Sequence, residues 1–199
     1  MAGRRAVFLD RDGTINEEVD FLCTPDELRL IAGAARAVRK LNDAGLLTCV
    51  ISNQSGVARG KLTEEALVPI HARLRAELAR SGATLDSIAY CPHHPTEGNA
   101  PYKRDCECRK PKPGMLLNAA REFGIDLQRS FVIGDSVVDM QAGNAVGATT
   151  ILVQTGYGPK SLATCREQNI PVAFVANSIV EGVDCILDLL KGEKSVEVP

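Results

Sequence analysis

Near the N-terminus the sequence reads Ala6-Val7-Phe8-Leu9-Asp10-Arg11-Asp12-Gly13-Thr14. Its first four residues are apolar strand formers, so we expect a buried strand that ends at Asp10. Asp10 and Asp12 are two residues apart, and side chains at that spacing leave the same face of an extended chain. Gly13 permits a tight turn that keeps the two carboxylates together. Such a pair favours a hard divalent cation, beside which one carboxylate can attack phosphorus while its protonated neighbour donates to the leaving oxygen.

The Asp pair alone does not establish this chemistry, because an Asp-rich turn can simply cap a strand. A calcium-binding loop is less favoured, since Gly13 stands at the fourth position of the segment, where an EF-hand loop has its glycine at the sixth. The choice between a catalytic and a capping role therefore depends on the polar groups that the other predicted strands bring to the same place.

The composition is that of an ordinary globular protein, with 45% hydrophobic and 24% charged residues among 199. A formal net charge of −2 argues against a nucleic-acid or membrane-surface partner, because such partners normally select a basic excess. No apolar run approaches the roughly 20 residues that a membrane span requires. We therefore expect a cytoplasmic protein in which the seven cysteines, where they cluster, are metal ligands and not disulfides.

Strand-like and helix-like segments alternate along the chain. Further strands are expected at residues 46–51, 87–90, 131–135 and 150–153, with a small element near 173–175. Helices are expected at residues 34–44, 64–80, 113–124 and 136–146, and a last one begins near a Ser178/Glu181 capping box. This alternation predicts an α/β fold with an open parallel sheet and helices on both faces. We expect one domain over residues 1–190, a loop at 15–30 and a frayed tail at 191–199.

Polar residues fall at the carboxyl ends of three predicted strands: Asp10, Ser52 and Asp135. An open parallel sheet builds its site at that edge, so we expect Asp10, Asp12 and Asp135 to surround one Mg²⁺ ion. Asp135 could also cap the following helix. Asp139, one helical turn further on, is either a partner of this site or a solvent-facing residue.

A phosphate site is expected beside these carboxylates. Ser52 and Asn53 can donate to phosphate oxygens, and Gln54 and Ser55 belong to the same turn, whose backbone N–H groups point to the same task. Further along the chain, the pair Arg109 and Lys110 would normally be a solvated surface feature. Its position directly after Cys108 favours a point charge from Lys110 for the phosphoryl group and a planar fork from Arg109 for a second anion.

A second metal site is indicated by two short cysteine motifs. Three thiolates and one imidazole complete a closed tetrahedral zinc set without a position for catalysis, and its members are Cys91, His93, Cys106 and Cys108. His94 is the fallback ligand, which otherwise faces solvent. The segment 91–108 holds almost no apolar residues, so a structural Zn²⁺ would replace the core it lacks.

These motifs resemble those of the haloacid-dehalogenase-like (HAD) phosphatases, and most closely the D-glycero-D-manno-heptose 1,7-bisphosphate 7-phosphatases within them. The resemblance rests on Phe8–Asn16, Asn53–Lys61, Cys91–Pro95 and Cys108–Met115. It implies a Rossmann-like phosphatase without a large cap domain and with a zinc-stabilised loop insertion. A small sugar bisphosphate would be its substrate, in the synthesis of activated heptose for bacterial surface polysaccharide.

The same resemblance implies roles for individual residues. Asp10 would be the nucleophile and Asp12 the general acid and base, with Mg²⁺ on Asp10, Asp135 and the backbone carbonyl of Asp12. Phosphate would be held by Ser52 and Lys110. Substrate recognition would fall to Asn53, Arg109 and a loop that consists of Glu18, Val19, Asp20 and Phe21.

Two departures from the family pattern leave alternatives open. Ser136 stands where some members carry Lys, and residues 18–21 match poorly, so the preferred anomer of the sugar is undecided. Histidinol-phosphate phosphatases share the Asp pair and a zinc loop, but theirs is typically shorter than the 91–108 segment. A zinc-containing binding module without catalysis is disfavoured by the intact Asp10 and Lys110. We expect a monomer.

Overall fold

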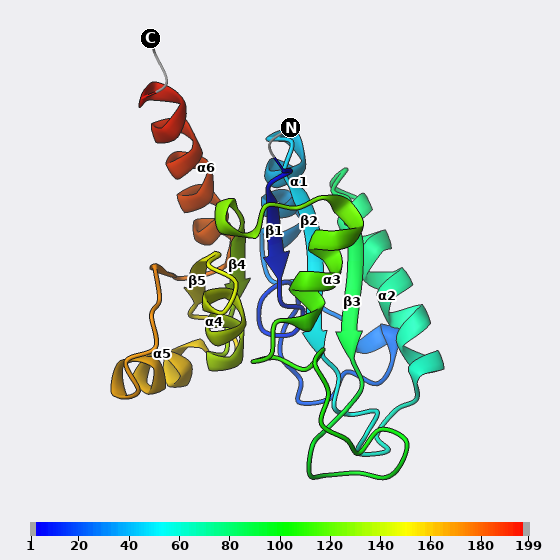
Figure 1. Cartoon of the computed structure of the whole chain (residues 1–199). Helices are drawn as coiled ribbons and strands as arrows, with labels where there is room; N and C mark the ends of the chain where they lie inside the picture. The colour runs from blue at the N-terminus through cyan, green and yellow to red at the C-terminus, as the bar shows by residue number, and fades with distance from the viewer. Residues whose placement is uncertain (1–2, 197–199) are drawn as a thin grey trace.

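The computed structural model describes residues 3–196 and contains one six-stranded sheet in which all strands are parallel. The strand order is β3-β2-β1-β4-β5-β6. The chain leaves the edge strand β3 and returns to the sheet as β4 beside β1, so the strand order reverses between β1 and β4 (Figure 1). The strands are β1 (Ala6–Leu9), β2 (Leu47–Asn53), β3 (Ser87–Cys91), β4 (Phe131–Gly134), β5 (Thr149–Val153) and β6 (Phe174–Ala176). The predicted fold class is thus confirmed.

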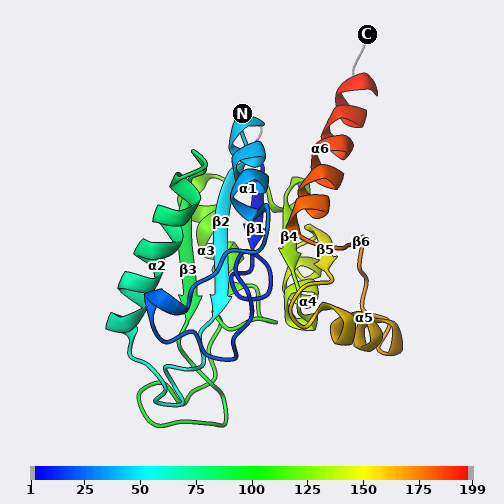
Figure 2. The same cartoon turned by 180° about the vertical axis from the view of Figure 1, so that it is seen from behind.

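Alternating side chains of the strands divide the interior between the two faces of the sheet. Val7 and Leu9 of β1 belong to one cluster, with the helices α1 (Ala34–Asp43), α2 (Glu64–Ala79) and α6 (Ile179–Val196). Ala6 and Phe8 belong to the opposite cluster, with α3 (Gly114–Phe123) and part of α4 (Val137–Asn144). The two views from front and back show these helix layers (Figures 1 and 2). A strand buried on both faces reads as a continuous apolar run, which is why β1 is readable from sequence.

Helix ends follow local chemistry that the sequence displays. The Thr63 side chain accepts a hydrogen bond from the N–H of Ala66 (3.3 Å) and caps α2, whose first turn carries Glu64 and Glu65. Pro69 lies inside this helix and does not delay its start, although a kink or a later start was predicted. At the end of α3, Gly124 adopts a left-handed φ of 66°, which glycine does without steric cost.

Two regions differ from the expectation. The helix α5 (Gly158–Glu167) was not predicted, because its first turn contains Gly158 and Pro159 and reads as a continuation of the preceding turn. The tail expected at residues 191–199 is instead helical as far as Val196, and its last three residues lie outside the described part of the chain. The small element near 173–175 is the edge strand β6.

The carboxyl ends of the strands all point to one end of the molecule, where the segments 10–30 and 91–113 gather (Figure 1). The segment 15–30 contains one short 3-10 helix, Pro25–Glu27, and an antiparallel bridge between Asn16 and Leu30 closes it. Among the residues that the structure describes, no helix combines the length and the apolar character that crossing a membrane requires. The site described next is built at this loop-bearing edge.

Candidate active site

Asp10 and Asp135 meet at the carboxyl ends of the neighbouring strands β1 and β4. The N–H of Asp10 donates to the carbonyl of Ile133 (2.9 Å), which extends the β1–β4 ladder by one residue and fixes its backbone. Gly13 has a φ of 75°, and a Cβ there would stand 2.1 Å from Oδ2 of Asp135. Glycine is therefore required at position 13 both for the turn and for the approach of the second carboxylate.

Lys110 is buried between two carboxylates. Its Nζ lies 2.9 Å from Oδ1 of Asp10 and 2.5 Å from Oδ1 of Asp139, and it also donates to the carbonyl of Ile51 (2.8 Å). Its side chain is only 2% exposed. Burial alone would lower the pKa of Lys110, but the two carboxylates outweigh that effect and raise the pKa, so the amine is charged. The predicted point charge beside Asp10 is present.

Asp139 is a partner of this site and is not a solvent-facing residue. One oxygen pairs with Lys110, and the other accepts hydrogen bonds from the backbone N–H (3.0 Å) and the hydroxyl (2.5 Å) of Ser136. Its side chain is fully buried. The Ser136 and Asp139 side chains form a capping box for α4, so the sequence that starts this helix also orients Lys110.

The carboxylates of Asp10, Asp135 and Asp139 lie within 4.8 Å of one another. Three acids face one ammonium group, and this excess of negative charge is costly in a buried site. Burial raises the pKa of Asp10 to about 7 despite Lys110, and burial together with the charge of Asp10 raises the pKa of Asp135 to about 8. These oxygens fit a hard divalent cation, for which Asp10 and Asp135 have free lone pairs, whereas both oxygens of Asp139 already accept hydrogen bonds from Lys110 and Ser136.

The Asp12 side chain points to a different set of partners. Arg11 is fully buried and holds this carboxylate through Nη2 (2.8 Å) and Nε (3.1 Å), while Asn16 (2.9 Å) and Gln54 (3.0 Å) add hydrogen bonds. Burial would raise the pKa of Asp12, but the guanidinium of Arg11 and these bonds outweigh it and lower the pKa. Asp12 is 20% exposed and borders the cavity described below.

The side chains of the turn after β2 hold neighbouring protein groups in place, in addition to lining the cavity. Gln54 donates to the hydroxyl of Ser52 (2.7 Å) as well as to Asp12. Asn53 is engaged by its own neighbours, since its amide donates to the carbonyl of Lys110 (3.0 Å) and accepts from the Lys110 N–H (3.1 Å). Asn53 therefore anchors the segment that carries Lys110.

A cavity of about 170 Å³ opens above these groups. It brings together most of the predicted site and is lined by Asp10, Asp12, Glu18, Asp20, Phe21, Leu22, Ser52, Asn53, Gln54, Ser55, Gly56, Leu62, Lys110, Asp135, Ser136, Val138 and Tyr157. Two predicted residues do not line it. Val19 is 42% exposed at the surface, and Arg109 donates through Nη1 to the carbonyl of His93 (3.0 Å).

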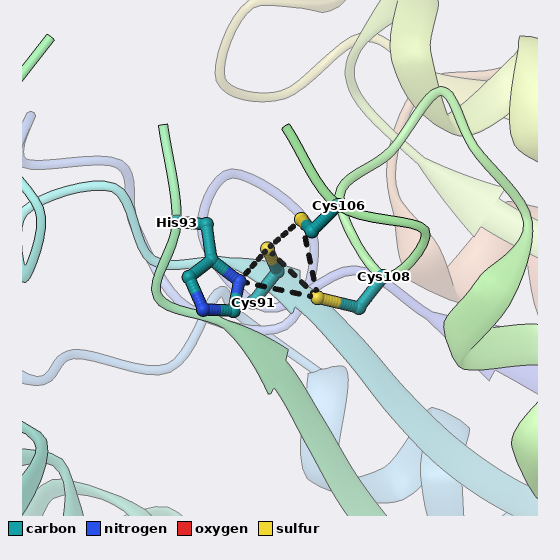
Figure 3. A group of neighbouring side chains, drawn as sticks. All are labelled: Cys91, His93, Cys106 and Cys108. Carbon is teal, nitrogen blue, oxygen red and sulfur yellow. Dashed lines mark hydrogen bonds between the residues drawn. The ribbon is translucent and has the colours of Figure 1, made fainter. Parts of the chain in front are cut away.

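The four cysteine and histidine residues predicted as zinc ligands come together at the end of β3 (Figure 3). The three Sγ atoms of Cys91, Cys106 and Cys108 are 3.2 to 3.5 Å apart, and Nδ1 of His93 lies 3.6 Å from Cys91 and 3.5 Å from Cys108. A tetrahedral zinc site with ligand bonds of about 2.0 to 2.3 Å has ligand–ligand edges of roughly 3.5 to 3.8 Å. The cluster fits such an ion, and His94 is not part of it.

Known proteins are similar to this chain in both sequence and fold. A HAD-hydrolase-like family model matches residues 107–182. The D-glycero-beta-D-manno-heptose-1,7-bisphosphate 7-phosphatases of Pasteurella multocida and Photorhabdus laumondii are 40% and 42% identical over 96% of this chain, and they are covered to 100% and 98% of their own length. The chain belongs to this family of HAD phosphatases.

Solved structures agree with this assignment. The D,D-heptose 1,7-bisphosphate phosphatase from B. bronchiseptica, crystallised with magnesium and phosphate, superposes with a TM-score of 0.82 at 35% identity. The match covers 93% of this phosphatase and 99% of that chain. The expected resemblance and the expected phosphatase class are thereby confirmed.

Around the cluster of three cysteines and His93, the phosphatase holds its 91–108 loop by polar contacts that sequence reasoning missed. The Glu64 carboxylate, at the start of α2, accepts hydrogen bonds from the phenols of Tyr90 (2.8 Å) and Tyr102 (2.9 Å). Arg59 pairs with Glu97 on the outer part of the loop. These contacts could not be predicted from the sequence, because no spacing or motif relates position 64 to position 102.

Tyr157 is a further residue of the site that sequence reasoning missed. It follows the Thr155-Gly156 turn after β5, its N–H donates to Oδ2 of Asp135 (2.7 Å), and its side chain borders the cavity. A fourth polar strand end was visible in the sequence at Thr155. It could have directed attention to the loop that follows, since each parallel strand delivers its loop to the same edge.

Proposed function

We propose that this phosphatase removes the C7 phosphate of D-glycero-β-D-manno-heptose 1,7-bisphosphate through an aspartyl-phosphate on Asp10. The observation that carries the proposal is the Asp10 carboxylate on a cavity wall, 2.9 Å from the buried ammonium of Lys110. Family membership supports the substrate, and the two curated relatives named above are described as acting on the β anomer. This choice of anomer goes beyond what the sequence alone allowed.

In the first step Asp10 attacks phosphorus and Asp12 gives a proton to the leaving oxygen of the sugar. In the second step a water molecule, deprotonated by Asp12, releases phosphate from Asp10. Arg11 keeps Asp12 ionised before substrate binds, which is the form that the second step needs. The first step needs the protonated form, and the negative charge of the incoming phosphate, close to Asp12, favours proton uptake there.

Other residues of the cavity bind the phosphoryl group. Lys110 neutralises it on one side, and the Ser52 hydroxyl, which accepts a bond from Gln54, keeps its own proton to donate to a phosphate oxygen. A Mg²⁺ ion held by Asp10, Asp135 and the backbone carbonyl of Asp12 would supply further positive charge against the same oxygens. The excess of carboxylate charge at this edge supports such an ion.

We also assign a structural Zn²⁺ to Cys91, His93, Cys106 and Cys108. Four protein ligands leave no open position, so this ion would hold the loop and take no part in the reaction. Cys108 is followed directly by Arg109 and Lys110, so a fixed Cys108 limits where these two side chains can reach.

The second phosphate of the substrate is assigned to Arg109. Only one anion can lie in line with Asp10, and the other needs a cation at a distance, for which a guanidinium offers a two-pronged contact. Arg109 does not line the cavity in the structure, and its Nη1 is on the His93 carbonyl, so the rest of its fork is available to a ligand outside the cavity. Arg109→Ala should lower kcat/KM on the bisphosphate at least tenfold more than on p-nitrophenyl phosphate.

The proposed function is tested by initial rates with Mg²⁺ on both anomers of heptose 1,7-bisphosphate, on histidinol phosphate and on p-nitrophenyl phosphate. We expect kcat/KM to be highest on the β anomer, with phosphate released from C7. Faster turnover of histidinol phosphate would overturn the assigned substrate. Absence of turnover on every ester would overturn the assignment of an active phosphatase.

A further inference from the structure

Two chain segments meet across the mouth of the catalytic cavity. One is the turn at residues 18–21, in which Asp20 takes a left-handed φ of 58°. The other is the β5–α5 turn, which presents Tyr157. The phenol of Tyr157 donates to Oδ1 of Asp20 at 3.3 Å, and this is a contact between residues 137 positions apart in sequence. Backbone strain of this kind is held in place by surrounding contacts and concentrates at functional sites.

The position of the Tyr157 ring is fixed relative to the reacting groups. Its backbone N–H donates to Asp135, while the neighbouring Thr155 hydroxyl donates to the carbonyl of Gly13 (2.5 Å). Gly156 between them has a φ of 54° and packs against Asp135, where a Cβ would come within 2.1 Å of Oδ2. The ring is 46% exposed and borders the cavity. It is therefore held rigidly by its backbone and remains free to touch a ligand.

The acidic residues around this part of the cavity determine which chemical groups of a ligand can bind there. Glu18 and Asp20 line it beside Tyr157, and among the described residues of the lining the one Lys or Arg is Lys110, which already faces Asp10 and Asp139. A second phosphate would be repelled here. Sugar hydroxyls, by contrast, can donate to carboxylates, exchange hydrogen bonds with a phenol and place their C–H faces on an aromatic ring.

We propose that Tyr157, together with Asp20, is a specificity-determining residue that binds the hydroxyl-bearing, non-phosphorylated part of the substrate. This inference rests on the proposed function and deepens it, because it divides the work: cations hold the phosphates and this pair holds the carbohydrate chain between them. Phe21 and Leu62, which also line the cavity, pack close to Gly56, where a Cβ would meet them at 3.0 and 2.4 Å, so these apolar side chains supply shape rather than hydrogen bonds.

Tyr157→Phe is the decisive variant, since it removes only the phenol oxygen and keeps the ring and the backbone N–H that binds Asp135. Activities are measured on heptose 1,7-bisphosphate, fructose 1,6-bisphosphate, ribose 5-phosphate and p-nitrophenyl phosphate. Loss of one hydrogen bond to a neutral hydroxyl should lower kcat/KM on the sugar esters about fivefold more than on p-nitrophenyl phosphate, mainly through KM. The Mg²⁺ concentration for half-maximal activity should be the same as in the wild type.

Asp20→Asn tests the partner, since Asn tolerates the left-handed backbone, and Asp26→Asn is its exposed control on the same segment. If Asp20 and Tyr157 bind one group together, the double variant loses less than the product of the two single losses. Equal losses on all four esters, or no change in selectivity, would overturn the inference. Wild-type preference among the esters tests the proposed function separately, because the inference concerns only how the variant changes that preference.

Discussion

The catalytic edge and the zinc loop lie side by side, yet they are stabilised in opposite ways. At the catalytic edge, charged groups are buried on a scaffold of parallel strands, and Asp10, Lys110 and Asp139 are each at most 13% exposed. The 91–108 loop, apart from its Cys and His cluster and Tyr102, has no large apolar side chain, and most of its residues are exposed. The first region has a core beneath it and an excess of one charge, whereas the second has almost no core and a complete ligand set.

The difference teaches which perturbation each region can survive. The strands hold the catalytic backbone, so a substitution there that adds no uncompensated buried charge should change chemistry more than fold. The loop depends on the cluster of Cys91, His93, Cys106 and Cys108, to which we assign Zn²⁺, and on a few surface contacts, so loss of the cluster should change geometry more than chemistry. A chain of contacts connects the two, from Arg11 through His71 to Tyr90, and from there through Glu64 to Tyr102.

Asp10→Asn should break the catalytic edge without breaking the fold. The amide cannot form the phosphoryl-enzyme but keeps the shape of the side chain, so turnover should fall by at least about 10³-fold. The midpoint of thermal unfolding should not decrease, because the substitution removes one of three crowded carboxylates. Steady-state kinetics and calorimetry give the two readings. Activity within tenfold of the wild type would rule out Asp10 as the nucleophile.

Lys110→Met, compared with Lys112→Met, separates a buried charge from an exposed one. Lys110 is 2% exposed between Asp10 and Asp139, while Lys112 is 36% exposed and pairs with Asp105 and Glu107. Removing the buried cation leaves two buried acids uncompensated and should lower the free energy of unfolding by about 3 to 5 kcal/mol. Removing the exposed one should lower it far less, because solvent screens the ion pairs of Lys112.

Urea unfolding of both variants at pH 7 with Mg²⁺ gives these free energies. Similar losses for the two lysines would show that solvent or the metal ion, and not Lys110, balances the charge of Asp139. In that case the capping box of Ser136 and Asp139 would be the main support of this carboxylate.

Removal of zinc should break the loop and spare the chemistry. Treatment with a zinc-selective chelator in excess Mg²⁺, or Cys106→Ser, should expose the amides of residues 91–94 and 105–110 to hydrogen exchange. Glu64 still binds Tyr102, so the centre of the loop should exchange less. We expect KM for the bisphosphate to rise about tenfold, with a smaller change in kcat, because Arg109 loses its fixed position. Zinc-free protein with unchanged kinetics would contradict this role.

The sequence was most informative where the residues of one short segment determine the local structure by themselves. The apolar run before Asp10 and the Cys-x-His and Cys-x-Cys motifs each contain the spacing that places them. The parallel sheet was therefore predicted correctly, and the structure brings together the carboxylates and the four residues that were predicted as zinc ligands. Helix α5 was missed because Gly158 and Pro159 look like loop residues, although Pro is favourable in the first turn of a helix.

What could not be predicted depends on partners distant in the chain. Asn53 was predicted to contact substrate and lines the cavity, but its two hydrogen bonds with the backbone of Lys110, 57 residues away, could not be predicted. Tyr157 is part of the site because the β5–α5 turn meets the 18–21 turn, and neither segment indicates the other. Position in the fold, rather than residue type, assigns these roles.

His71 gives the smallest expected effect and tests the connection between the two regions. Its Nε2 is 3.4 Å from Nη1 of Arg11, and its ring lies against Tyr90 with 5.6 Å between centroids. Burial, and then the charge of Arg11, lower the pKa of His71 to about 4 from an ordinary 6.5. Between these two values the unfolded chain binds more protons than the folded one, so stability must fall as the pH falls from 6.5 towards 4. As the pH falls from 7.5 to 5.5, His71 alone should lower the free energy of unfolding by about 1 kcal/mol.

His71→Gln, which cannot titrate, should therefore show a shallower loss of unfolding free energy than the wild type over that range in urea titrations. If the two proteins lose free energy of unfolding equally over this range, His71 is protonated beside Arg11 in the folded protein. Arg11 would then hold Asp12 without a neutral imidazole next to it.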